Sequence, residues 1–452
     1  MSERKGGIHA VILACPGSDG EGCRYSVCLK ASLHEHHTVM NASTARRSTL
    51  IPAAADRPGD DPIFQLNGEA TRRAQSGESI VNATLGALME DDGTLAILPT
   101  VVEALRQVPA KRAAAYAPIS GDAPYLAAVI EDVYGGTPLA AQCVAAATPG
   151  GTGALHHAIA LFLEPGQDLL TTDFHWGPYD TLASQARRGV RTVRMFDARG
   201  GFDLAAYEAG LSRCLADQGR ALVFLNTPCH NPTGYSLDER EWREVARITR
   251  AAGAQAPVAF LVDMAYARFG TPELQRWQHH VEPIVETCTV LTAWTASKSL
   301  AQYGSRIGAL LAASSDPAER ERIKNALAYA CRGTWSNCNH LGILAAIELL
   351  TKPELRAAVE TERQRLVALL DDRVAVFNRA ARAAGLRYPR YEGGFFVSVF
   401  APDAERVAAA MRADGVYVVP MEGAVRVALC STPAAAVPRL VASLAKALGA
   451  QA

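Results

Sequence analysis

A lysine among small residues is the first feature of this sequence that points to chemistry. Lys298 lies in the segment TASKSLAQYGSRIGAL (295–310), directly after an apolar run and eight positions before Arg306. A surface lysine needs no such surroundings, whereas a lysine that reacts with an aldehyde must be uncharged and aimed at its ligand. Lowering the pKa of a lysine by roughly 3 units, from about 10.4 toward 7, corresponds to about 4 kcal/mol of differential interaction. Burial and the positive charge of Arg306 both act in this direction, so the segment predicts a neutral, reactive amine.

Short apolar runs that alternate with amphipathic stretches must position this lysine. The runs are expected to be strands at residues 168–173, 191–196, 221–226, 258–264, 289–294 and 307–314. Strands that are apolar over their whole length and separated by helices are typical of a mostly parallel sheet covered on both faces. One of the helices is expected to begin with a capping box of Ser236 and Glu239 and to close at Gly253. The sequence therefore predicts an α/β fold.

The two ends of the chain differ from this central region. Residues 1–58 lack sustained periodicity, and we expect them to form a disordered tail. We predict a smaller α/β domain assembled from residues 59–100 and 346–452, beside a large domain formed by residues 101–345. The expected elements after the large domain include one long helical stretch with a break and two strands, at 353–385, 393–400 and 424–430.

Several polar and aromatic residues follow the predicted strands. Asn231 comes after the strand 221–226, Asp263 and Tyr266 close the strand 258–264, and Trp176 follows the strand 168–173. In open parallel sheets, ligands bind beyond the carboxyl ends of the strands, so we expect these side chains to share one site. Each also has an ordinary alternative: Asp263 can cap a helix, Asn231 can form a turn before a proline, and Trp176 can belong to the core.

A glycine-rich turn, TPGGTGAL (148–155), opens another predicted helix. The N–H groups of Gly151 and Thr152 at this helix start would suit a phosphate, although such turns also simply begin helices. The turn lacks the Gly-Lys-Ser/Thr ending of a P-loop, so a nucleoside triphosphate is not expected. Together with Lys298 and Arg306, these residues describe an aromatic ring with a cationic nitrogen, a phenolate oxygen, an aldehyde and a phosphate. That ligand is pyridoxal 5'-phosphate.

Seven blocks of the sequence resemble the fold-type I, class I aminotransferases of the aspartate and aromatic amino-acid subgroup. In order over roughly residues 61–435, they are YAPISG, TPGGTGAL, CHNPTG, DMAYARF, TASKSLAQYGSRIG, RGTWSN and RVALCS. The resemblance implies the PLP-transferase fold, pyridoxal 5'-phosphate as cofactor and a homodimer with shared active sites. It also implies two-step, ping-pong transfer of an amino group from an L-amino acid, acidic or aromatic, to a 2-oxo acid such as 2-oxoglutarate.

The resemblance further implies a role for each residue around the cofactor. Lys298 would bind the cofactor covalently and then move the proton at the substrate Cα, and Asp263 would keep the ring nitrogen protonated. Asn231 and Tyr266 would donate to the phenolate oxygen, and Trp176 would stack on the ring. The implied catalytic residues are therefore Lys298, Asp263 and Tyr266. The phosphate would be held by Gly151, Thr152, Thr295 and Arg306, and by Tyr116 of the neighbouring subunit.

The substrate would be bound by a second set of residues. Arg426, in RVALCS, would bind the α-carboxylate with both guanidinium nitrogens. Arg332, in RGTWSN, would meet a distal carboxylate from the neighbouring subunit, and an ordinary interface arginine is the alternative. Gly86 would make a contact through its backbone. Two residues of the cofactor site, Trp176 and Asn231, complete this set.

Two positions depart from the family pattern. Aspartate-type members carry a histidine behind the aspartate that meets the ring nitrogen, whereas this chain has Tyr179 there. Leu88 stands where an aromatic residue is usual near the substrate. Both departures argue against a strict aspartate enzyme, and the tyrosine hydroxyl could replace the histidine.

The bulk composition narrows the function classes. A formal net charge of −1 over 452 residues gives no support to nucleic-acid or anionic-membrane binding. No apolar run approaches the roughly 18 residues that a membrane span needs. The 10 cysteines show no regular framework, which predicts a reducing cytoplasm. A possible zinc set has spacing that fits no common finger, so we predict no metal site; its members are Cys23, Cys28, His34, His36 and His37.

Two other functions remain open at this point. A β-lyase or decarboxylase would use the same cofactor and scaffold, and would release pyruvate or carbon dioxide without a 2-oxo acid acceptor. A regulator that senses amino acids would need a DNA-binding domain. Residues 1–58 show neither a helix-turn-helix pattern nor a basic patch, which disfavours the regulator.

Overall fold

The computed structural model describes residues 48–55, 57, 59 and 62–449. The possible zinc ligands Cys23 to His37 and most of the expected tail lie outside the described residues. Within that tail, residues Pro52–Ala55 form a short helix, α1. The chain divides into two units, Met1–Gly59 and Asp60–Ala452, and everything that follows concerns the second.

The second unit is built on a sheet that has seven strands within the described residues, in the order β2-β8-β7-β6-β5-β3-β4. Strands β3 to β7 run parallel to one another, and β8 is antiparallel to both β7 and β2. The predicted α/β fold with a mostly parallel sheet is confirmed. The strands are β2 (Cys143–Pro149), β3 (Asp168–Thr172), β4 (Gly189–Val193), β5 (Ala221–Asn226), β6 (Val258–Asp263), β7 (Thr289–Thr295) and β8 (Ile307–Ala313).

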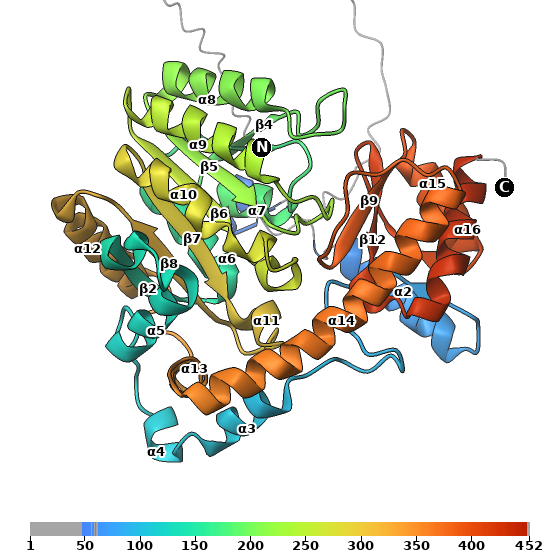
Figure 1. Cartoon of the computed structure of the whole chain (residues 1–452), viewed down its shortest axis with the longest axis horizontal. Coiled ribbons are helices and arrows are strands. Elements are labelled where there is room, and N and C mark those ends of the chain that lie inside the picture. The colour runs from blue at the N-terminus through green and yellow to red at the C-terminus, as the bar shows by residue number, and fades with distance from the viewer. Residues whose placement is uncertain (1–47, 56, 58, 60–61, 450–452) are drawn as a thin grey trace, which may run out of the picture. The chain divides into compact units, whose positions relative to one another are not determined.

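Helices cover both faces of this sheet, as Figure 1 shows. Alternate strand residues point to opposite faces: Val223 and Leu225 join one buried cluster, while Leu222 and Phe224 join the other. The first cluster packs under α5 (Ala123–Tyr134), α8 (Leu204–Gln218) and α9 (Glu239–Gly253). The second packs under α6 (Gly150–Phe162), α7 (Pro178–Gln185) and α12 (Pro317–Gly333). Burial on both faces explains why the central strands β5, β6 and β8 are apolar over nearly their whole length.

The start of α9 corrects the predicted capping box. Asp238, not Ser236, is the N-cap, and its partner in the box is Glu241, not Glu239. Glu241 is held in this register because its carboxylate also accepts from the Tyr235 hydroxyl and the Phe202 N–H. The Ser236 hydroxyl accepts instead from the backbone N–H of Cys229 at 2.9 Å.

The corrected box predicts which acidic residue stabilises α9. Asp238→Ala should lower the free energy of unfolding by about 1–2 kcal/mol, because the backbone N–H of Glu241 loses its acceptor. Glu239→Ala should change the free energy of unfolding by less than about 0.5 kcal/mol. The Glu239 side chain is 73% exposed, and its 3.5 Å ion pair with the exposed Arg243 is weakened by solvent. Urea unfolding of both variants measures the difference. Equal losses of unfolding free energy in the two variants would contradict the assignment of the box to Asp238 and Glu241.

The segments from the two ends of the chain meet beside the main sheet. Strand β1 (Val81–Asn82) pairs in parallel with β10 (Val416–Tyr417). Strands β9 (Phe396–Phe400), β11 (Val419–Met421) and β12 (Ala424–Ala428) form an antiparallel sheet in the order β11-β12-β9. The surrounding helices are α2 (Pro62–Gln75), α15 (Ala404–Ala413) and α16 (Val437–Leu448). The domain limits at residues 100 and 345 stay a prediction.

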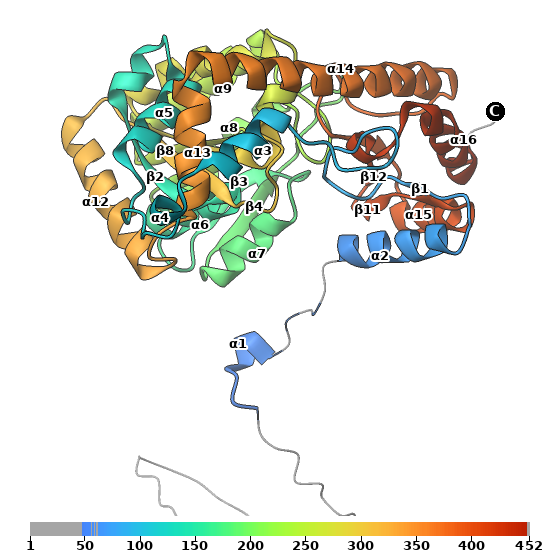
Figure 2. The same cartoon turned by 90° about the horizontal axis from the view of Figure 1, so that it is seen from below.

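One helix links these segments to the main sheet. Helix α14 (Pro353–Ala383) runs for 31 residues from α13 (His340–Thr351) to α16, as Figure 2 shows. The predicted break in this stretch is wrong, because no proline or glycine follows Pro353 within the helix. Side chains buried along its whole length, from Val359 to Ala381, hold it straight through both regions.

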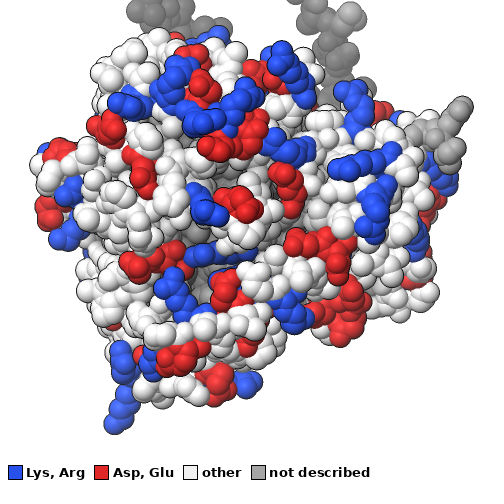
Figure 3. Space-filling model, in the orientation of Figure 1, with Lys and Arg blue, Asp and Glu red and all other residues white. Residues whose placement is uncertain are grey.

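The charged surface agrees with the balanced composition. On the face shown in Figure 3, lysine and arginine side chains are interspersed with aspartate and glutamate. None of the helices in the described part of the chain is long and apolar enough to cross a membrane.

Candidate active site

The carboxyl ends of three neighbouring strands meet at one cavity. Asn226, Asp263 and Thr295 end β5, β6 and β7, and Asn226 pairs in register with Asp263. The cavity and the open space at its mouth together hold about 450 Å³ of empty volume. Its lining holds nine predicted cofactor residues: Gly151, Thr152, Trp176, Asn231, Asp263, Tyr266, Thr295, Lys298 and Arg306.

Lys298 lies just beyond β7, on the short helix α11 (Ala296–Ser299), and Figure 1 shows β7 running toward this helix. The Thr295 hydroxyl caps the helix by accepting from the N–H of Ser297. The Lys298 Nζ lies 5.3 Å from the centroid of the Tyr266 ring. Burial and then the nearby Arg306 lower the pKa of Lys298, while Asp263 opposes them. The amine is therefore neutral above this lowered pKa and becomes charged as the pH falls through it.

Asp263 is a buried carboxylate held from two sides. Its Oδ2 accepts a hydrogen bond from the Tyr179 hydroxyl at 2.8 Å, and its Oδ1 accepts from the N–H of Ala265 at 3.2 Å. Burial raises the pKa of Asp263, while the bonds from Tyr179 and Ala265 and the charge of Lys298 act to lower it. The strand end is fixed as well, because the Asn226 side chain donates to the backbone carbonyl of Asp263 at 2.8 Å.

Asn231 and Tyr266 form a buried polar pair on another wall of the cavity. The Asn231 Nδ2 donates to the Tyr266 hydroxyl at 3.3 Å, and the Asn231 backbone N–H donates to the Asn226 Oδ1 at 2.6 Å. The Asn231 Oδ1 is buried without a hydrogen-bond partner among the described residues. Buried polar atoms are almost always paired, so this amide is a place where a polar ligand atom fits.

The start of α6 and the arginine after α11 form a cradle at one end of the cavity. Arg306, whose backbone has a positive φ of 52°, donates to the hydroxyl of Ser297 and to the carbonyl of Tyr303. A Cβ on Gly150 would lie 2.5 Å from this guanidinium, so the close approach requires glycine there. A helix N-terminus, hydroxyl groups and a guanidinium together suit a phosphate dianion.

Of the predicted substrate residues, Trp176 and Asn231 line this cavity, whereas Arg426 and Gly86 lie outside its described lining. Arg426, on β12, is 6% exposed, donates to the Thr84 carbonyl at 2.8 Å and lies 4.5 Å from the centroid of the Phe396 ring. The Phe396 ring also packs edge-on against Tyr266, which lines the cavity. A Cβ on Gly86 would come within 3.0 Å of Phe396. The segment with Gly86 and the arginine strand thus adjoin the same aromatic wall.

Two residues expected to act across a subunit boundary lie away from the cavity within this chain. Tyr116 is 90% exposed. Arg332, near the end of α12, is also exposed and donates to the Ser336 hydroxyl at 2.7 Å. Neither residue belongs to the described lining of the cavity.

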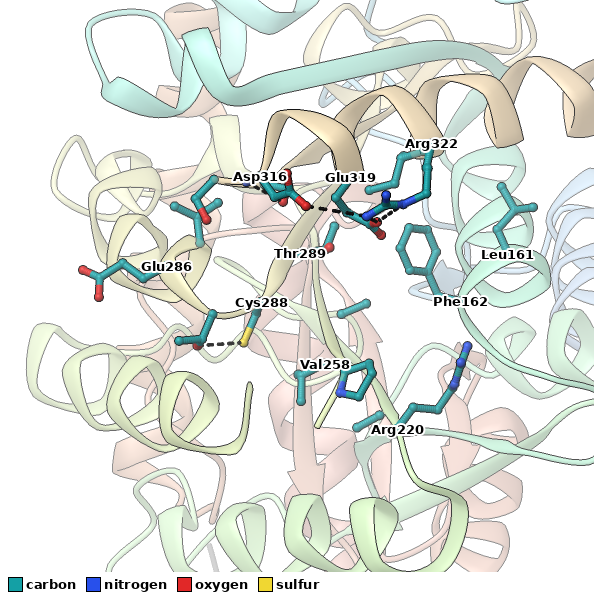
Figure 4. Close-up of a pocket in the computed structure, with 18 of the residues that line it drawn as sticks. Leu161, Phe162, Arg220, Val258, Glu286, Cys288, Thr289, Asp316, Glu319 and Arg322 are labelled. Carbon is teal, nitrogen blue, oxygen red and sulfur yellow. Dashed lines mark hydrogen bonds and ion pairs between the residues drawn. The ribbon is translucent and has the colours of Figure 1, made fainter. Parts of the chain in front are cut away.

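A larger hollow, with about 1410 Å³ of empty space, lies where β5, β6 and β7 begin. Figure 4 shows its charged rim, where Arg322 is paired with Asp316 at 3.5 Å and with Glu319 at 2.7 Å. The convergent amine, carboxylate and amide groups are all at the opposite ends of these strands. The smaller cavity is therefore the candidate active site.

Comparison with known proteins gives the family of the chain. The sequence profile described as "Aminotransferase class I and II" matches residues 79–444. The chain belongs to this family. Over 302 residues it is 32% identical to an aromatic-amino-acid aminotransferase of Paracoccus denitrificans, covering 66% of this chain and 74% of the relative. A crystal structure of an aminotransferase from Anaerococcus prevotii, 30% identical, superposes with a TM-score of 0.85 and covers 89% of this chain and 100% of that one.

Pyridoxal 5'-phosphate is the cofactor of this aminotransferase. An aromatic-amino-acid aminotransferase from Burkholderia pseudomallei is described as covalently bound to it; that structure is 25% identical, with a TM-score of 0.73, and covers 87% of this chain and 98% of that chain. The residues of the cavity fit the group, since the cradle of Arg306 suits its phosphate, and the Asn231 Nδ2 and the Tyr266 hydroxyl, 3.3 Å apart, are donors that suit its phenolate oxygen. Asp263 offers the ring nitrogen an acceptor, and Lys298 offers the aldehyde an amine.

The sequence had not singled out four residues of the lining: Leu155, Asn226, Ala265 and Ser297. Two of them had a usable signal. Asn226 is the last residue of a correctly predicted strand, and Ser297 directly precedes Lys298. Leu155 and Ala265 are apolar, and nothing in their neighbourhood distinguishes them from core residues.

Proposed function

We propose that this aminotransferase moves the amino group of an acidic or aromatic L-amino acid to a 2-oxo acid such as 2-oxoglutarate. The observation that carries the proposal is the convergence of Asn231, Asp263 and Lys298 on one cavity from three separate segments of the chain. An aromatic donor is supported by the identity to an aromatic-amino-acid aminotransferase. An acidic donor is supported by Arg332, which could pair with a second carboxylate.

Each group of the cavity then has one task. Bound pyridoxal phosphate supplies an aldehyde and an electron-withdrawing ring that stabilises negative charge at the substrate Cα. Lys298, with its lowered pKa, binds the cofactor covalently and afterwards removes and returns the proton at Cα. Asp263 keeps the ring nitrogen protonated, and Asn231 and Tyr266 donate to the phenolate oxygen. The proposed phosphate ligands are Gly151, Thr152, Thr295, Arg306 and, from the second subunit, Tyr116.

Substrate binding is assigned to the aromatic wall next to the cofactor. Arg426 would pair with the α-carboxylate, and Trp176 would stack on the cofactor ring and limit the space for the substrate. Gly86 would contact the substrate through its backbone. Leu88, which is buried and whose N–H donates to the Tyr303 hydroxyl at 2.9 Å, fixes this segment against the loop that follows Lys298.

The half-reaction tests the proposed function directly. The purified holoenzyme is mixed in turn with L-aspartate, L-glutamate, L-tyrosine, L-phenylalanine and L-alanine, without any 2-oxo acid. Acidic and aromatic donors should convert the visible band of the lysine-bound cofactor to the shorter-wavelength band of its aminated form, and the rates rank the donors. A band that persists with every donor contradicts the proposal. Release of pyruvate or carbon dioxide without an acceptor would favour the lyase or decarboxylase instead.

We also propose that the active enzyme is a homodimer. Several large apolar side chains are exposed on the chain's surface: Leu95, Ile97, Tyr116, Ile119, Tyr329 and Leu341. Two of the segments that carry them are in contact, because His340, at the start of α13, lies 2.8 Å from the carbonyl of Ala115. Exposed apolar residues gathered in this way are typical of subunit interfaces. A reducing cytoplasm is the compartment we propose, supported by the free thiols of the cysteines in the described part of the chain.

Arg332 gives the dimer a functional test. Arg332→Ala should lower kcat/KM for aspartate by about 30-fold or more, since a paired charge is worth about 2 kcal/mol or more when it is desolvated. The value for phenylalanine should change by less than about threefold. Arg322→Ala, on the same helix and 65% exposed, is the matched control and should change neither value. Equal losses for both donors would make Arg332 a structural residue.

Mixing Lys298→Ala with Arg332→Ala, which should both have little activity with aspartate, shows which subunit supplies Arg332. Lys298→Ala and Arg332→Ala are unfolded together and refolded as a mixture. In a mixed dimer, one site combines the intact lysine of one subunit with the intact arginine of the other. Random pairing should restore roughly a quarter of the wild-type activity with aspartate. If each arginine served its own subunit, the mixture would show no more activity than the Arg332→Ala protein alone.

A further inference from the structure

We propose that Tyr179 is a positioning residue of this aminotransferase, whose phenol holds the Asp263 carboxylate in the orientation and charge state that the ring nitrogen of the cofactor requires. The Tyr179 hydroxyl donates to the Asp263 Oδ2 at 2.8 Å. Among the described residues, Asp263 lines the cavity and Tyr179 does not. The phenol therefore acts through the carboxylate, and the inference rests on the proposed role of Asp263.

The Tyr179 ring is fixed by aromatic packing on three sides. It is fully buried and meets Phe224 of β5 edge-on, with ring centroids 5.3 Å apart. Trp176 also meets it edge-on at 5.8 Å, and the His175 ring lies parallel to it at 6.1 Å. The Tyr179 backbone N–H donates to the Trp176 carbonyl at 2.9 Å. With no room to turn, the hydroxyl keeps one direction, toward Asp263.

The loop that carries Tyr179 is anchored before it reaches the site. One ring nitrogen of His175 contacts the Thr172 carbonyl at 3.0 Å, and the other contacts the Asp180 carboxylate at 2.8 Å. The Asp173 carboxylate accepts from the N–H groups of Phe174 and Met195, both at 2.9 Å. This one loop presents Trp176 to the cavity and Tyr179 to Asp263. The positions of Trp176 and Tyr179 are thus fixed together by the same anchored loop.

The protonation states make the hydrogen bond one-directional. Burial raises the pKa of Tyr179 well above that of an ordinary tyrosine, so the phenol keeps its proton and donates. The groups that face this pair are Lys298, Tyr266 and His175. The bond from Tyr179 lowers the pKa of Asp263, which burial has raised. Without the phenol, the pKa of Asp263 rises further. When the solution is acidified, Asp263 is then protonated at a higher pH and no longer holds the ring nitrogen as a carboxylate.

The test removes a single hydroxyl and compares two tyrosines. Tyr179→Phe keeps the packing and deletes the donor. Tyr207→Phe is the matched control, because Tyr207 is also fully buried and its hydroxyl makes one hydrogen bond, to Thr249 at 2.6 Å, between α8 and α9. The dissociation constant of pyridoxal phosphate is measured from pH 5 to pH 9 for both variants and the wild type. Thermal unfolding of each cofactor-free protein reports the structural loss.

We expect Tyr179→Phe to raise the dissociation constant of pyridoxal phosphate roughly 10- to 100-fold. We also expect the acid limb, the part of the pH profile where binding weakens on acidification, to move to higher pH. Tyr207→Phe should match the wild type in both respects. A Tyr179→Phe protein with the wild-type constant and acid limb overturns the inference and leaves the proposed function intact. A wild-type protein that forms no link at Lys298 would instead refute the proposed function. If Tyr179→Phe does not fold, Tyr179→His decides: a constant within about threefold of wild type at pH 6 supports the inference, and a rise of tenfold or more overturns it.

Discussion

Lys298→Ala should abolish the covalent attachment of the cofactor and lower the rate of amino transfer by at least about 10⁴-fold. The variant loses two functions at once, the amine that binds the aldehyde and the base that moves the proton at Cα. The expected loss is large because no second lysine lines the cavity among the described residues. Treatment of the holoenzyme with borohydride, followed by peptide mapping, should find the cofactor on the peptide that contains Lys298.

The control for this variant is another lysine of the same unit. Lys324 is 59% exposed on α12 and pairs with Glu321 at 3.3 Å, so Lys324→Ala should keep both the cofactor label and the activity. The Lys298→Ala protein should still fold, because the substitution removes an amine whose charged form burial disfavours. A label on any other peptide, or a Lys298→Ala protein with more than about 1% of wild-type activity, would contradict the assignment.

The placement of the proposed cofactor residues around one cavity was predictable because it follows from sheet topology. Asp263 and Lys298 come directly after apolar runs, and parallel strands bring their carboxyl ends to one edge whatever the packing details are. The strand 221–226 was predicted at its observed bounds, and 258–264 within one residue, since buried strands have no polar interruptions. The strand predicted at 191–196 instead spans Gly189–Val193.

The remaining features depend on contacts that no local pattern contains. Strand β2, with the alanine-rich sequence CVAAATP, has few β-branched residues and was missed, although pairing with β8 defines it. The register of α9 depends on where Glu241 is buried, and a local motif pointed two residues too early. The sequence showed Tyr179 to be unusual, but only the structure shows its hydroxyl on Asp263. Long-range hydrogen bonds of this kind decide how a site is tuned after topology has placed it.

Arg426→Ala should lower kcat/KM for the amino donor and for the 2-oxo acid alike, by roughly 30- to 5000-fold, because both substrates carry the same α-carboxylate. The range corresponds to about 2–5 kcal/mol for loss of one partner of a buried charge pair. Arg426→Lys should lose a smaller part of this, since an ammonium keeps the charge but lacks the planar fork. Cofactor affinity should stay within about threefold of wild type, because Arg426 is outside the described lining of the cofactor cavity.

A second variant separates loss of substrate binding from loss of structure as causes of the lower kcat/KM of Arg426→Ala. Arg439 is a matched control, since it also donates from its guanidinium to main-chain carbonyls, those of Ser79 and Asp414, at 2.8 and 2.9 Å. Arg439→Ala should lower the free energy of unfolding without a specific loss of kcat/KM. Arg426 differs because it faces the Phe396 ring, which packs against Tyr266 in the lining of the cavity. Its loss should therefore lower kcat/KM for the amino donor and for the 2-oxo acid. Equal kinetic losses in the two variants would mean that Arg426 only supports β12, and the α-carboxylate site would have to lie elsewhere.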